Sequence, residues 1–123
     1  MRAMSKGTER TAMKRKKMTE FDWETRERIK IRDTGCIFCQ MNYRMPEDTF
    51  GLGAFQVMHF VPRSQGGLGI EENGAVGCLY HHNLLDNGRN TRKEMLGLFE
   101  NYLREQYPEW DKKKLFYKKG MER

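Results

Sequence analysis

The sequence predicts a small α+β domain, in which a β-hairpin packs on a helix and helices flank this unit on both sides. Three observations support this class. The chain has only 123 residues, and a core of that size often needs a covalent or metal staple. Two short β-prone segments enclose a glycine-bearing loop. Two ligand pairs, "CIFC" and "CLYH", lie at the ends of this region.

The cysteine and histidine spacing predicts a zinc site. Cys36 and Cys39 form one pair with two residues between them, and Cys78 and His81 form a second. Two intervening residues let a tight turn aim both side chains at one ion, and three thiolates with one imidazole suit structural Zn²⁺. An odd number of cysteines argues against a disulfide framework. The alternative is a CxxC redox pair, which would leave the second pair unexplained.

The positive charge lies at the start of the chain, and we expect residues 1–18 to be a disordered basic arm. Residues 1–17 carry seven Lys or Arg against one Glu, so the whole net charge of +6 lies there. Such an arm suits a polyanion, which makes DNA the expected partner. The candidate nucleic-acid contacts in it are Lys14, Arg15, Lys16 and Lys17. The alternative is a solvated tail without a partner.

We expect a domain over residues 19–107 that begins with a helix over 19–33. Thr19 and Asp22 resemble a capping pair. Phe21, Thr25 and Ile29 fall on one face of this helix. Residues 40–53 contain Pro, Asp and Gly and are predicted to be loop.

The centre of the chain predicts a hairpin followed by a helix. Residues 54–61 are β-prone and end at Pro62, which lacks the N–H that a strand ladder needs. A long loop follows, and "AVGC" is a second short strand. Residues 79–87 should form a helix that stops at Gly88.

The clearest helix lies over residues 91–107. Thr91 and Glu94 fit a capping box, and Pro108 follows its end. Its apolar stripe predicts a core face, made of Met95, Leu98, Phe99, Tyr102 and Leu103. Residues 108–123 are predicted to be a basic C-terminal tail.

A second cation site is predicted on the helix after the second strand. His82 is adjacent to a zinc ligand and therefore points to another side of the helix. Asp86 lies four residues later, on the same face as His82. An imidazole and a carboxylate there could hold a divalent ion in an open site.

These residues resemble the HNH endonucleases of the ββα-metal (His-Me finger) group, in their cysteine-bearing, treble-clef-like form. The matching stretch is "CIFC" followed by "HFVPRSQGGLGIEENGAVGCLYHH", within residues 28–88. His59, Asn73 and His82 fall at the three positions that give the family its name. Charged helical flanks are common in its phage-encoded members.

The resemblance implies a hydrolase that nicks or cuts DNA phosphodiester bonds. His59 would be the general base, Asn73 would hold the loop that orients it, and Arg63 would contact a phosphate. His82 and Asp86 would hold a catalytic Mg²⁺, Mn²⁺, Ni²⁺ or Zn²⁺, beside the structural Zn²⁺. The sequence has no run of about 18 apolar residues and no apolar signal segment, so we expect a cytosolic protein that does not cross a membrane. The resemblance further implies a phage or bacterial protein in the host cytoplasm, with phage packaging or host proteins as additional partners.

Two other functions remain open. Many members of the family carry Asp or His directly before the first histidine, where this chain has Met58. One alternative is therefore a catalytically decayed, zinc-stapled module that binds nucleic acid. The other is a treble-clef module for protein interaction, which the basic arm argues against.

Overall fold

The computed structural model describes residues 6–47 and 54–121. Residues 1–5 of the expected arm, 48–53 of the expected loop and 122–123 of the expected tail lie outside them. The helices and strands, in chain order, are α1 (Lys6–Thr19), α2 (Trp23–Asp33), α3 (Ile37–Gln40), β1 (Phe55–His59), β2 (Gly74–Cys78), α4 (Leu79–Asn87) and α5 (Thr91–Gln106). This mixture of helices with an antiparallel hairpin confirms the predicted α+β class.

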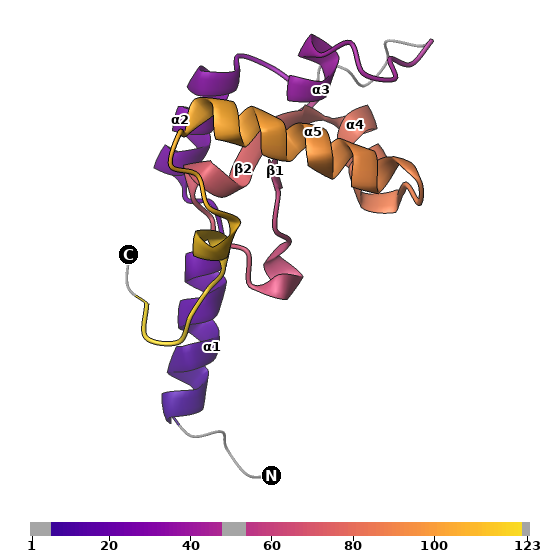
Figure 1. The fold of residues 1–123 in the computed structure, drawn as a ribbon. Coiled ribbons are helices and arrows are strands. Elements are labelled where there is room, and N and C mark those ends of the chain that lie inside the picture. Colours follow the sequence, from indigo (N-terminus) through magenta and orange to yellow (C-terminus); the bar gives the residue numbers. More distant parts are fainter. Residues whose placement is uncertain (1–5, 48–53, 122–123) are drawn as a thin grey trace.

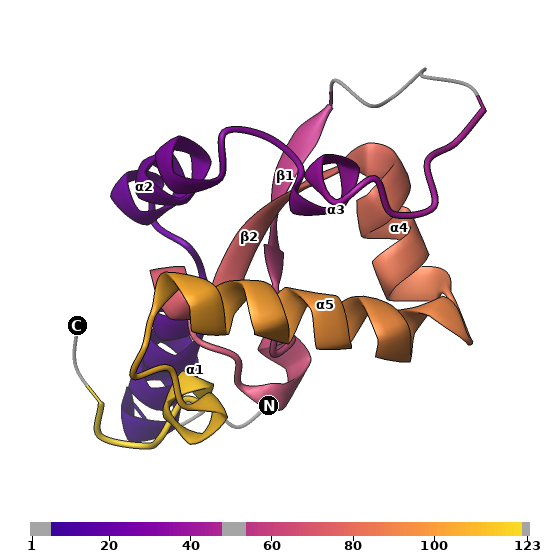
Figure 2. The same cartoon turned by 45° about the horizontal axis from the view of Figure 1, so that its top comes forward.

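The hairpin of β1 and β2 is the centre of the fold. The strands pair antiparallel, with Met58 opposite Ala75 and His59 opposite Gly74. Figure 2 shows α5 running across one face of the hairpin, with α4 near one end of α5 and α3 over its middle part. Because side chains alternate along a strand, Met58 enters the core, where it is 1% exposed, and His59 faces the other side.

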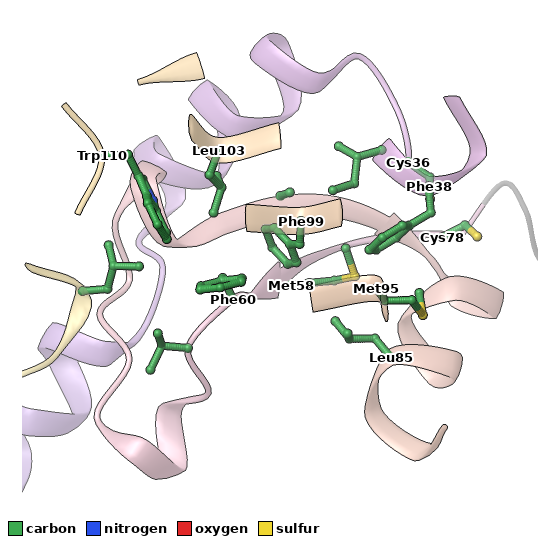
Figure 3. Packing of buried hydrophobic residues seen from close by; sticks show 14 residues of the cluster. Cys36, Phe38, Met58, Phe60, Cys78, Leu85, Met95, Phe99, Leu103 and Trp110 are labelled. Atoms are coloured by element: carbon green, nitrogen blue, oxygen red, sulfur yellow. The ribbon is translucent and has the colours of Figure 1, made fainter. Parts of the chain in front are cut away.

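The main core lies between the hairpin and α5. Figure 3 shows Phe99 of α5 packed beside Phe60 and Met58. The predicted apolar stripe is confirmed, since Met95, Phe99 and Leu103 are fully buried. The predicted capping box is wrong: Asn90 is the N-cap residue, and Glu94 instead accepts a hydrogen bond from the Tyr43 hydroxyl at 2.6 Å.

The N-terminal segment is a helix over the described part of the expected disordered arm. In Figure 1, α1 extends away from the hairpin, and the end nearest the body is its C-terminal end. Lys, Arg, Met and Ala are good helix formers, and the last turn is held by burial of Met18 and Thr19. The Gly69 N–H also donates to the Met18 carbonyl at 2.9 Å. Charge alone did not reveal these contacts.

The next helix begins at Trp23, four residues later than expected. Thr19 ends α1, and its hydroxyl donates to the Arg15 carbonyl at 2.9 Å instead of capping α2. Asp22 is the N-cap of α2, and its carboxylate accepts from the Thr25 N–H at 2.8 Å. Phe21, Thr25 and Ile29 are buried, as their shared face predicted.

The segment after α5 packs on the domain, which differs from the expected tail at 108–123. Trp110 and Leu115 are buried. The Trp110 indole N–H donates to the Glu72 carbonyl at 2.7 Å, and Phe116 forms a bridge with Gly67. Burial of the apolar side chains of Trp110 and Leu115, together with the hydrogen bond of the indole, stabilises this packed arrangement more than the neighbouring lysines favour a solvated tail.

Candidate functional site

Four side chains meet where α3 and α4 begin. Cys36 is the N-cap of α3, and its sulfur accepts from the Cys39 N–H at 3.4 Å. Cys78 is the N-cap of α4, and its sulfur accepts from the His81 N–H at 3.4 Å. Each pair is thus built by the first turn of a helix, so that both ligands of the pair point the same way.

The spacing of the four ligand atoms fits a tetrahedral zinc ion. With Zn–S near 2.3 Å and Zn–N near 2.0–2.1 Å, tetrahedral ligands lie about 3.8 Å apart for two sulfurs and about 3.6 Å apart for sulfur and nitrogen. The Cys39 and Cys78 sulfurs are 3.7 Å apart. The His81 Nδ1 lies 3.6, 3.5 and 3.2 Å from the sulfurs of Cys36, Cys39 and Cys78.

The surroundings of His81 orient it as a ligand through Nδ1. Its Nε2 lies 2.7 Å from the Tyr43 carbonyl oxygen. A carbonyl only accepts, so Nε2 carries the proton and Nδ1 keeps its lone pair for a metal. Burial lowers the pKa of His81, which favours the neutral imidazole that metal binding requires.

Burial and crowding disfavour the charged form of the cysteine thiols. Burial and then the neighbouring Cys36 raise the pKa of Cys39 to about 12, and burial also raises the pKa of Cys36. A divalent cation at the centre of the cluster would reverse this effect, because it favours the thiolate form. The prediction that these four residues could hold a metal ion is confirmed.

A pocket of about 220 Å³ lies beside this centre, on the other side of α4. It brings together His59 and His82, the two histidines predicted to take part in catalysis, and the predicted metal-binding carboxylate of Asp86. Its lining residues are Val57, Met58, His59, Pro62, Arg63, His82, Leu85, Asp86 and Arg92. A separate pocket of about 620 Å³ between Ile70 and Trp110 contains neither histidine nor cysteine in its lining.

His59 is held in place by α1 and by an aromatic ring. Its Nε2 lies 2.7 Å from the carbonyl oxygen of Thr19, the last residue of α1. Its ring centroid is 4.2 Å from that of Phe21. Because the carbonyl must accept, Nε2 carries the proton, and the neutral imidazole has its lone pair on Nδ1.

The pKa of His59 is lowered from its ordinary value. Burial is the largest cause, the positive charges of Arg63 and Arg26 lower the pKa further, and the bond to the Thr19 carbonyl opposes them. His59 is therefore neutral at neutral pH and able to accept a proton.

His82 and Asp86 form a pair on the exposed side of α4. The His82 Nε2 lies 3.2 Å from the Asp86 Oδ2. The His82 Nδ1 bonds to the Gln56 side-chain oxygen, which is an acceptor, so Nδ1 carries a proton. In the neutral ring, Nε2 therefore presents its lone pair to a carboxylate oxygen.

Asn73 is buried and joins the two ends of the loop that follows β1. Its Oδ1 accepts from the Val61 N–H at 2.7 Å, and its Nδ2 donates to the carbonyls of Val61 and Leu68 at 3.1 and 2.8 Å. Its own carbonyl accepts from the Phe60 N–H at 2.9 Å. Asn73 does not line the histidine pocket, so its contacts are those of a residue that positions the backbone after His59.

The predicted basic contacts lie on α1 and on the turn after β1. Arg15, Lys16 and Arg63 line a common groove. Lys17 is exposed and Lys14 is half-buried, and neither lines this groove or the histidine pocket.

Sequence reasoning missed three contributors to the pocket. Arg92 lines it from α5, where its guanidinium donates to the Leu85 carbonyl at 2.8 Å. Gln56 orients His82, and the Thr19 carbonyl orients His59. Gln56 lies three residues before His59 on the same strand, so a polar side chain there was a local signal in the sequence. The positions of Arg92 and Thr19 near the pocket depend on tertiary packing, which the sequence pattern does not show.

No protein-family model, curated protein or solved structure matches the chain significantly. Within residues 6–47 and 54–121, no helix has the length and apolar character needed to cross a membrane.

Proposed function

We propose that this protein is a metal-dependent endonuclease of the HNH type, which hydrolyses phosphodiester bonds of DNA. One observation carries the proposal: His59 and the His82–Asp86 pair line a single small pocket, together with two arginines. A base, a cation site and positive charge are the groups that phosphodiester hydrolysis requires. The basic residues of α1 and the motif from Cys36 to His82 also support it.

In this proposal His59 acts as the general base. Its Nδ1 takes a proton from a water molecule, and the water oxygen forms a bond to phosphorus as the bond from phosphorus to the leaving sugar oxygen breaks. The lowered pKa of His59 keeps Nδ1 free at neutral pH. The bond to the Thr19 carbonyl fixes the ring and leaves the reactive nitrogen to the pocket.

The His82–Asp86 pair is the proposed site of a catalytic divalent cation. Two ligands of an octahedral ion at about 2.1 Å and at right angles lie about 3.0 Å apart, close to the observed 3.2 Å. A nitrogen lone pair facing a carboxylate also needs a cation between them, either a proton or a metal ion. A bound Mg²⁺, Mn²⁺, Ni²⁺ or Zn²⁺ would supply Lewis-acid stabilisation of charge on the phosphate.

Arg63 and Arg92 are the proposed phosphate contacts. They reach the pocket from the turn after β1 and from the start of α5. A guanidinium donates paired hydrogen bonds that match phosphate oxygens. Their charges would hold the DNA backbone near His59 and offset the charge that develops on phosphorus.

A plasmid assay tests the proposal. Supercoiled DNA with Mg²⁺, Mn²⁺ or Ni²⁺ should become nicked or linear in the presence of the protein, and His59→Ala and Asp86→Asn should each lower the rate at least 100-fold. Asn83→Ala is the matched control, because Asn83 is exposed on α4 and does not line the pocket. Equal rates for His59→Ala and the control would refute His59 as the base.

The buried position of Met58 favours a second candidate, a zinc-stapled module that binds DNA without cutting it. The family often places a metal-binding side chain at this position, but here the side chain packs in the core at 1% exposure. Retention of DNA in a salt-sensitive gel shift, without nicking under any of the three metals, would support this candidate.

A further inference from the structure

A second groove, of about 320 Å³, lies beside the histidine pocket between α1 and the turn after β1. Its lining is made of Ala12, Arg15, Lys16, Thr19, Arg63 and Ser64. It therefore contains three cationic side chains and two hydroxyls, and no carboxylate. Arg63 lines both this groove and the histidine pocket, so the two are adjacent.

The groove is built by contacts between the last turns of α1 and Arg63. The Arg15 guanidinium donates to the Arg63 carbonyl at 3.4 Å. The Arg63 guanidinium donates to the Lys16 carbonyl and the Thr19 hydroxyl, each at 3.4 Å. These long contacts place the Arg63 side chain beside the last turns of α1, so that the three cations line one groove.

The Arg63 guanidinium can exchange its present partners for a phosphate at small cost. Bonds of 3.4 Å are beyond the usual 2.7–3.2 Å range for N–H···O bonds. Its ion pair with Glu20, also at 3.4 Å, is exposed on both sides, and such pairs contribute little. A phosphate would offer shorter, charge-assisted bonds.

We propose that this groove is a second phosphate site, which binds a backbone phosphate of the same nucleic-acid strand beside the phosphate in the histidine pocket. The proposal rests on the proposed function for its substrate class. In it, α1 is a clamp: Arg15 and Lys16 bind the strand, and Arg63 spans the two phosphate positions. A polynucleotide uses both sites, whereas a diester with a single phosphate uses the histidine pocket alone.

A binding measurement tests the groove independently of catalysis. The variant Arg15→Gln/Lys16→Gln removes two charges from the groove. Lys113→Gln/Lys119→Gln is the matched control, since both lysines are exposed and lie outside both grooves. Each is titrated with a fluorescent duplex oligonucleotide, in zinc-replete buffer without a chelator, over a range of salt concentrations.

The groove variant should bind at least tenfold more weakly at low salt. The slope of log affinity against log salt should become shallower by about 1 to 2, because about 0.9 of slope is lost for each phosphate contact removed. The control pair should keep a slope close to that of the natural protein. Equal losses for the two pairs would overturn the proposal, since they would mean that only net charge matters.

A second arm compares cleavage of the duplex with hydrolysis of bis(p-nitrophenyl) phosphate, which has one phosphate. The groove variant should lower the ratio of kcat/KM for duplex to that for the small diester at least tenfold. An equal loss on both substrates would overturn the proposal, because it would mean that α1 acts only by holding His59. If no variant cleaves either substrate, the endonuclease proposal fails, and the binding arm still decides the groove.

Discussion

Replacing Asn73 by alanine should separate the positioning role of this residue from the chemistry of the pocket. The side chain is fully buried and makes three hydrogen bonds to backbone groups on both sides of the loop after His59. None of these groups has a substitute partner in alanine. We therefore expect the Asn73→Ala variant to be less stable than the natural protein, and its loss of activity to follow the fraction of protein that is unfolded.

The size of the effect follows from these contacts. The Val61 N–H would be left buried and unpaired, which costs about 1–3 kcal/mol. The carbonyls of Val61 and Leu68 would each lose a donor, at about 0.5–1.5 kcal/mol apiece. We expect a total of about 2–6 kcal/mol, against a typical domain stability of about 5–15 kcal/mol.

Urea unfolding followed by circular dichroism measures this change. With a slope of about 2 kcal/mol per molar urea, the midpoint should fall by about 1–3 M. Asn101→Ala is the control, since Asn101 is exposed on α5, and its free energy of unfolding should stay within about 0.5 kcal/mol of that of the natural protein. A midpoint for Asn73→Ala equal to that of the control, with activity abolished, would refute the positioning role and favour direct participation in catalysis.

Three further predictions concern the metal centre, the pocket and the core. Elemental analysis should find about one tightly bound zinc per chain. Cys78→Ser or a chelator should unfold the domain, measured as loss of the near-UV circular dichroism signal, because structural zinc contributes about 10–16 kcal/mol in small zinc domains. A chelated protein with an unchanged spectrum would contradict this. The rate of DNA cleavage should rise with pH through the pKa of His59, which is lowered from about 6.5, and level off once the imidazole is neutral. Arg63→Gln should move this rise to higher pH, because the charge of Arg63 lowers the pKa of His59. A pH–rate profile that does not rise below neutral pH would exclude His59 as the general base. Asp33→Asn should cost about 3–5 kcal/mol in urea unfolding, because it leaves the partly buried Arg32 without its carboxylate at 2.6 Å; a change below about 1 kcal/mol would contradict this.

Elements whose position depends on neighbouring residues alone could be predicted from the sequence. The helix from Leu79 to Asn87 and its stop at Gly88 follow from a periodic segment and a breaker, and both agree with the structure. The ligand pairs were equally predictable, since two intervening residues on one helical turn bring their ends together. The start of α2 was misplaced because Thr19 and Asp22 both suit a cap, and only the burial of Thr19 at the end of α1 decides between them.

Features that depend on distant contacts could not be predicted in this way. The arm resembled a solvated charged tail, because its anchoring by Gly69 joins segments far apart in the chain. Asp33 and Arg32 resembled ordinary charged residues at a helix end. In the fold, the Asp33 carboxylate accepts from the Val76 N–H at 2.8 Å and bonds to the Tyr102 hydroxyl, while Arg32 donates to the Gly74 carbonyl at 2.6 Å. This network ties α2 to β2 and to α5.

The metal centre and the histidine pocket share α4, and this sharing makes them dependent on each other. His81 points to the sulfurs from one side of the first turn, and the next residue, His82, points to the pocket from another side. Fixing the ring of His81 between a metal and the Tyr43 carbonyl therefore fixes the rotation of α4 about its axis. That rotation in turn sets where His82 and Asp86 stand relative to His59 on β1. A zinc ion held by these four residues would therefore support the relative placement of His59 and the His82–Asp86 pair, so we expect its removal to disturb the proposed chemistry as well as the fold.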